Sequence, residues 1–133
     1  MSSEEPKRIH VYVDLKEMKE DEHSWYTIHL YHDPDGQKEW LKPIRVRRRG
    51  AIITFKPVSG KPCDWTFWNL TIHPLGKPTA AVDLDWYVTE DEAVLHDTTP
   101  RKGKRKFSYT LALLHKNGTK YYLDPRLVNR GGG

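Results

Sequence analysis

The stretch Phe107–Asp124, FSYTLALLHKNGTKYYLD, decides the fold class. Large apolar residues occupy every second position from Phe107 to Leu113, and alternate side chains of a strand share one face. Asn117-Gly118 separates this run from a second one, Lys120–Asp124. Asn-Gly between two such runs is typical of a type I′ hairpin turn, because both central residues of that turn need positive φ. The stretch therefore predicts two antiparallel strands joined by a tight turn.

Similar runs precede this hairpin. The pattern predicts further strands at Ile9–Leu15, Trp25–His32, Trp40–Arg48, Ala51–Lys56, Trp65–Ile72, Val82–Val88 and Ala93–His96. Asp33-Pro34-Asp35-Gly36 is expected to form a turn, and Asp124-Pro125 to end the sheet. The segment Lys16–Ser24 is almost wholly charged, which predicts a solvated loop or a single helical turn.

These patterns predict an all-β protein. About eight or nine short strands with regular turn signals indicate a single antiparallel β-sandwich with an immunoglobulin-like arrangement. We expect the sandwich to span residues 9–128, between a disordered tail at 1–8 and a flexible tail at 129–133. The inner faces are predicted to hold Ile9, Val11, Val13, Ile28, Leu30, Ile44, Val46, Phe67, Leu84, Trp86, Tyr109, Leu111 and Leu113. Trp65 and Trp68 also suit such a core.

The composition limits the class of protein. The chain has 133 residues, enough for one domain, and a single cysteine, Cys63, which excludes an intrachain disulfide. No apolar run approaches the roughly 20 residues that span a bilayer, and the first residues do not resemble a secretory signal. We therefore expect a cytoplasmic protein that does not bind membranes.

Basic residues form the sharpest functional signal. The formal net charge is +4, and two clusters carry much of the positive charge. Arginine suits bidentate contacts to phosphate, so these clusters predict a polyanion-binding or nucleic-acid-binding surface. The candidate residues are Arg45, Arg47, Arg48, Arg49, Arg101, Lys102, Lys104 and Arg105.

Exposed aromatic residues give a second candidate surface. Trp25, Tyr31 and Trp40 are expected to be accessible and to contact a partner. The first functional hypothesis is a non-enzymatic protein-interaction or self-assembly module that uses an edge strand. Polyanion binding is the alternative, and an enzyme of unknown class is the third.

Several residue groups could carry catalytic or metal chemistry, but each has a simpler interpretation. His29 and His32 fall on opposite faces of their strand, so they do not form a chelating pair. Asp33 and Asp35 resemble a truncated calcium loop without its later ligands, and a turn explains them better. Asp83 and Asp85 suit a solvent face, and no helix is expected to activate Cys63 beside His73. We therefore expect no metal, no cofactor and no catalytic residues.

Two motifs resemble those of the DP-EP family of small bacterial β-sandwich proteins. They are His32-Asp33-Pro34-Asp35-Gly36 and Tyr121-Tyr122-Leu123-Asp124-Pro125. The chain length and the all-β pattern are also similar to that family, whereas the Glu-Pro pair, Glu5-Pro6, lies at the N-terminus. The resemblance implies a fold and no particular chemistry.

Overall fold

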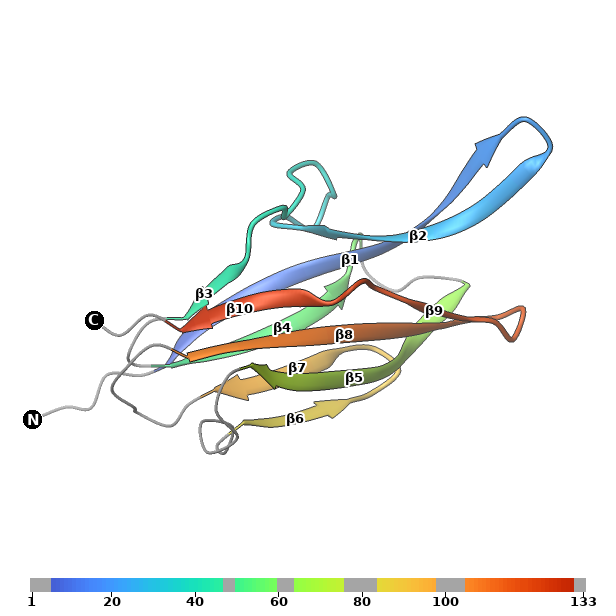
Figure 1. Cartoon of the computed structure of the whole chain (residues 1–133). Coiled ribbons are helices and arrows are strands. Elements are labelled where there is room, and N and C mark those ends of the chain that lie inside the picture. Colours follow the sequence, from blue (N-terminus) through green and yellow to red (C-terminus); the bar gives the residue numbers. More distant parts are fainter. Residues whose placement is uncertain (1–5, 47–49, 60–63, 76–83, 98–104, 131–133) are drawn as a thin grey trace, which may run out of the picture.

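The computed structural model describes residues 6–46, 50–59, 64–75, 84–97 and 105–130, and these residues form strands, turns and loops without a helix. The all-β prediction is confirmed. Figure 1 shows the strands, which are β1 (Lys7–Glu20), β2 (His23–Tyr31), β3 (Ile44–Val46), β4 (Ala51–Pro57), β5 (Trp65–Leu75), β6 (Asp85–Val88), β7 (Ala93–Asp97), β8 (Arg105–His115), β9 (Lys120–Tyr122) and β10 (Arg126–Arg130).

The strands form two sheets. Sheet A has the order β2-β1-β4-β7-β6, and sheet B has the order β3-β10-β8-β5, with β9 also paired to β8. Most neighbours are antiparallel, but β1 pairs with β4 and β3 pairs with β10 in parallel. The expectation of a wholly antiparallel protein is therefore wrong. After β2 the chain crosses to sheet B to form β3, and it then returns to sheet A beside β1 in the same direction as β1.

Side chains from both sheets meet in one apolar cluster. Phe55 of β4 is fully buried, and its ring lies 5.2 Å from that of Tyr109 of β8. Burial raises the pKa of the Tyr109 hydroxyl above its ordinary value. Every predicted inner-face residue except Leu84 and Trp86 is buried, and Leu84 is partly buried against the same cluster.

Two tryptophans that were expected in the core are exposed. Trp86 is 41% accessible because β6 is one of the two edge strands of sheet A and has a neighbouring strand on one side only. Trp68 is 48% accessible because the β5–β8 register shifts between Phe67 and Asn69. The exposed Trp68 ring is contacted by Lys120, whose amino group lies 4.2 Å from the ring centre in a cation–π interaction.

The charged segment Lys16–Ser24 is strand rather than loop or helix. β1 continues to Glu20, a turn follows at Asp21 and Glu22, and β2 begins at His23. Asp21 takes positive φ, 55°, as aspartate tolerates in tight turns. The result is a projecting hairpin, residues 16–27, which we call the arm (Figure 1).

Other boundaries also differ from the prediction. β3 is short, because the chain before Pro43 leaves the extended path. The sheet does not end at Asp124-Pro125, since β10 follows and pairs on both sides, with β8 and β3. β1 begins at Lys7 and β10 ends at Arg130, so the expected domain limits at residues 9 and 128 both fall inside strands.

Candidate polyanion-binding cleft

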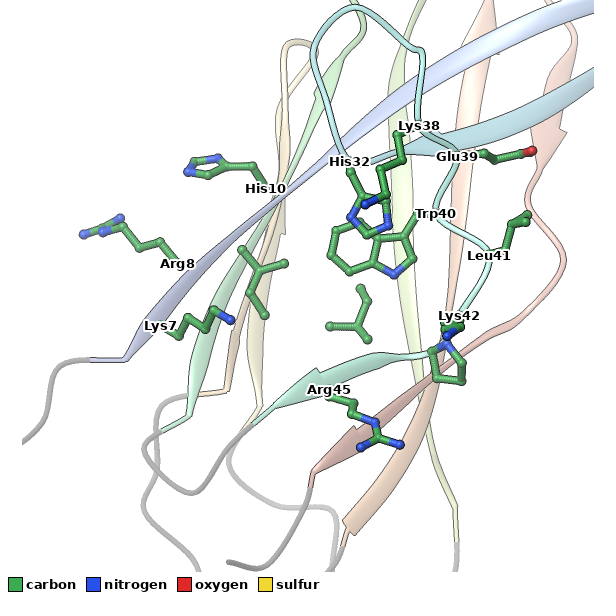
Figure 2. A pocket seen from close by; sticks show the side chains of 13 residues that line it. Lys7, Arg8, His10, His32, Lys38, Glu39, Trp40, Leu41, Lys42 and Arg45 are labelled. Carbon is green, nitrogen blue, oxygen red and sulfur yellow. The ribbon is translucent and has the colours of Figure 1, made fainter.

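A cleft of about 670 Å³ lies beside the first residues of β1, where β2 is missing as a neighbour. β2 ends at Tyr31, which is opposite Tyr12, so the earlier residues of β1 pair with β4 alone. We call this hollow the basic cleft (Figure 2). Its lining residues are Lys7, Arg8, Ile9, His10, His32, Lys38, Glu39, Trp40, Leu41, Lys42, Pro43, Ile44 and Arg45.

A tight turn shapes one wall of the basic cleft. The Asp33 carboxylate accepts hydrogen bonds from the backbone N–H groups of Gln37, at 3.0 Å, and Lys38, at 2.9 Å. The Gly36 N–H donates to the Asp33 carbonyl, and Gly36 takes φ of +66°, which a side chain would strain. The turn predicted from Asp33-Pro34-Asp35-Gly36 is thus confirmed, and it reverses the chain against the end of β2.

This reversal brings two rings together. The His32 N–H donates to the Lys38 carbonyl, and the Trp40 N–H donates to the Leu30 carbonyl, both at 2.8 Å. Side chains of His32 and Trp40 consequently stack, with ring centres 4.0 Å apart and planes 9° from parallel. Figure 2 shows this pair in the middle of the basic cleft.

The turn also sets the charge state of two groups. Hydrogen bonds from backbone N–H groups, that of Lys38 above all, lower the pKa of Asp33. Partial desolvation against Trp40 and the nearby Lys38 charge lower the pKa of His32, although the Asp33 carboxylate opposes this. His32 is therefore a neutral stacking partner at neutral pH.

Four exposed cations surround the stacked pair. Lys7 extends from the first position of β1, Lys38 and Lys42 come from the segment after the turn, and Arg45 comes from β3. Their long side chains are free to adapt to a ligand. Arg8 and His10 also line the basic cleft but point outward from the other face of β1 (Figure 2).

The acidic lining residue, Glu39, is turned away from the cations. Its carboxylate lies 3.1 Å from Nδ1 of His29 on β2, whose other ring nitrogen meets the Thr27 hydroxyl at 2.7 Å. Figure 2 shows Glu39 pointing away from the stacked rings. The Glu39 carboxylate therefore does not neutralise the lysine and arginine side chains of the basic cleft.

The structure brings part of the predicted basic surface to this end of the molecule. Arg45 lies in the basic cleft, and backbone register places Arg105 of β8 opposite Arg130 of β10, which is in turn opposite Val46 of β3. The end of β3 and the start of β8 thus share one end of sheet B. The remaining predicted residues lie outside the described part of the chain: Arg47, Arg48, Arg49, Arg101, Lys102 and Lys104.

The three predicted partner-binding aromatics do not form one surface. Trp40 lines the basic cleft, whereas Trp25 is 43% accessible on the arm, opposite Met18. The prediction that Tyr31 is exposed is wrong, because only 5% of it is accessible. The amino group of Lys16 lies 5.1 Å from the Tyr31 ring centre.

Lys7, Lys38, Lys42 and His32 were not predicted as site residues. The positions of Lys38 and Lys42 depend on the path of residues 37–43, whereas the sequence pattern predicts a strand over Trp40–Arg48. The alternation of Lys38 and Lys42 around Trp40, directly after a turn motif, is the signal that could have indicated a basic aromatic surface.

No group of three or more metal-ligating side chains converges among the residues that the structure describes. Cys63 and Asp83, which were considered for metal or acid–base chemistry, lie outside those residues, and Asp85 is exposed on β6. Within the same ranges, the chain forms no helix with the length and apolarity needed to cross a bilayer.

No protein-family model matches the chain, and no curated protein matches it significantly. The resemblance to the DP-EP family stays a prediction.

Proposed function

We propose that this protein is a non-enzymatic binding protein that holds single-stranded nucleic acid in the basic cleft. The observation that carries the proposal is the ring of Lys7, Lys38, Lys42 and Arg45 around the stacked His32–Trp40 pair. Proteins that bind single strands without sequence preference combine a positive groove with an aromatic platform in this way.

The charges supply most of the expected affinity. Each lysine or arginine that neutralises a phosphate releases condensed counterions, so affinity for nucleic acid falls steeply with salt. Four exposed cations on three separate chain segments can follow a flexible backbone of phosphates.

The stacked pair favours a single strand over a duplex. Trp40 is partly buried, and its indole is held in place by the His32 ring stacked 4.0 Å away, so it is already oriented. A base from a single strand can reach such a ring, whereas the bases of a duplex are stacked on each other.

We also propose an immunoglobulin-like β-sandwich as the arrangement of the two sheets. The shared apolar cluster, with the Phe55–Tyr109 contact between sheets A and B, supports this fold. An edge-strand interaction with a protein partner stays a prediction. The partner would bind along edge strand β6, where Trp86 and Tyr87 are exposed.

Fluorescence anisotropy with a labelled twelve-nucleotide deoxythymidine strand tests the function. Four phosphate contacts to a single strand predict a slope of log K against log salt of about −3, or roughly fiftyfold weaker binding at 200 mM than at 50 mM salt. The variant Lys42→Glu/Arg45→Glu should bind more weakly and lower the magnitude of the slope by about 1.5.

The matched control is Lys116→Glu/Lys120→Glu, which makes the same change in net charge in the β8–β9 hairpin. It should bind almost as the natural chain does. If the control loses as much affinity as the cleft variant, or if a duplex of equal length binds more tightly than the single strand, the proposal is wrong.

A further inference from the structure

The arm carries charge of the opposite sign to the basic cleft. The segment from Lys16 to Glu22 holds four carboxylates and two lysines. Glu20, Asp21 and Glu22 are consecutive at the tip, and all three are exposed. The arm thus presents a compact acidic tip to solvent.

Apolar side chains stand directly behind this tip. Met18 and Trp25 are opposite each other in the β1–β2 ladder and are 38% and 43% accessible. The basic cleft has an apolar counterpart in Leu41, which is 70% accessible beside the partly buried Trp40. The two surfaces therefore match in apolar content as well as in charge.

The arm cannot fill the basic cleft of its own chain. Both lie on the same continuous strand, β1, and the ten residue steps from His10 to Glu20 separate them by about 33 Å at the rise of an extended strand. Figure 1 shows the arm directed away from the end where β3 lies. Any contact between these surfaces must therefore join two molecules.

We propose that a second copy of this chain docks the acidic tip of its arm into the basic cleft. Glu20, Asp21 and Glu22 of one copy meet the cleft lysines and Arg45 of the next, while Met18 and Trp25 contact Leu41. The inference goes beyond nucleic-acid binding and does not depend on it, although both ligands compete for one site.

This contact is heterologous, because the two surfaces that meet are different. A docked pair still has one free arm and one free cleft at its two ends, so association continues into open chains unless the rotation between copies closes a ring. An excess of nucleic acid should shorten these chains, because it occupies the clefts.

Sedimentation velocity of the full chain over a range of concentrations tests the proposal. At low salt the weight-average mass should rise with protein concentration, and 500 mM salt should return it to that of a monomer. The arm-reversal variant, Glu20→Lys/Asp21→Lys/Glu22→Lys, and the cleft-reversal variant, Lys42→Glu/Arg45→Glu, should each weaken association at least about tenfold. The first brings like charges together, and the second leaves two lysines and two glutamates in the cleft, with no net attraction for the acidic tip.

Mixing these two variants gives the sharper result. The natural acidic arm of the cleft-reversal variant fits the natural basic cleft of the arm-reversal variant, so an equimolar mixture should associate at a concentration at which neither variant does alone. The arm-reversal variant should still bind the deoxythymidine strand, which separates failure of this proposal from failure of the proposed function.

The charge control reverses a second acidic turn, Glu90→Lys/Asp91→Lys/Glu92→Lys, between β6 and β7. It changes net charge as the arm-reversal variant does and should associate like the natural chain. Three results would overturn the proposal. The natural chain could be monomeric at every concentration, the control could lose as much association as the arm-reversal variant, or the mixture could stay monomeric.

Discussion

The two halves of β1 are one continuous strand, yet they have opposite roles. Residues 7–13 pair with β4 and bury Ile9, Val11 and Val13, whereas residues 14–20 pair with β2 alone and reach solvent. The difference shows that one neighbouring strand suffices to keep a charged segment extended, but that a core requires cover from the second sheet. The half with the core stabilises the fold, and the other half is available for contacts.

The largest test of this comparison removes a ring from the covered half. Phe55 is the β4 partner of Val11, and Phe55→Ala should lower the free energy of unfolding by about 3–5 kcal/mol, because it leaves a cavity against Tyr109. Trp25→Ala on the arm should cost less than about 1 kcal/mol. Urea denaturation followed by circular dichroism measures both, and similar losses would contradict the comparison.

A smaller effect distinguishes the turn at the basic cleft from the turn of the β8–β9 hairpin. Asp33→Ala removes the acceptor for the Gln37 and Lys38 N–H groups and should cost about 1 kcal/mol. Asn117→Ala, which removes the acceptor for Thr119, should cost a similar amount. Only the Asp33 variant should lose affinity for the deoxythymidine strand, because its turn positions His32 beside Trp40. Equal affinities would show that the turn does not shape the site.

The smallest expected effect is a dependence on pH. The folded-state pKa of His32 is lowered, so on acidification the unfolded chain takes up this proton first. The contribution of His32 to stability is therefore present above its unfolded pKa of about 6.5 and decreases as pH falls through the lowered folded value. Over the same range the basic cleft gains positive charge, and nucleic-acid affinity should rise a few-fold.

The variant His32→Gln isolates this titration from that of the other histidines. Its anisotropy titrations should show a weaker rise in affinity below pH 6.5 than those of the natural chain. The same rise in both proteins would assign the pH dependence to groups other than His32.

Periodicity in the sequence predicted the covered regions well. Alternation at Val11 and Val13, and from Phe107 to Leu113, reports burial on one face of a strand, and that signal is local. It failed at Trp68 and Trp86, because exposure there depends on a register shift and on a position at the edge of sheet A. Neither feature is encoded in the residue itself.

The candidate site was less predictable than the core. Arg45 was expected from its cluster, but Lys7 lies far from it in the sequence and reaches the same cleft only because β2 ends at Tyr31. The parallel pair β1–β4 was also missed, since a parallel partner leaves no turn motif between the strands. Pairing between distant segments thus determined the position of the cleft residues, which local sequence patterns could not predict.

That parallel pair has a consequence for the order of folding. The β1–β2 hairpin closes over a two-residue turn and can form within about 1–10 µs, whereas β4 must return from a distant part of the chain. Until it does, Ile9, Val11 and Val13 form a bare apolar edge that can pair with another nascent chain. A lower rate of expression should accordingly raise the yield of native protein, since fewer chains that still lack β4 are then present together.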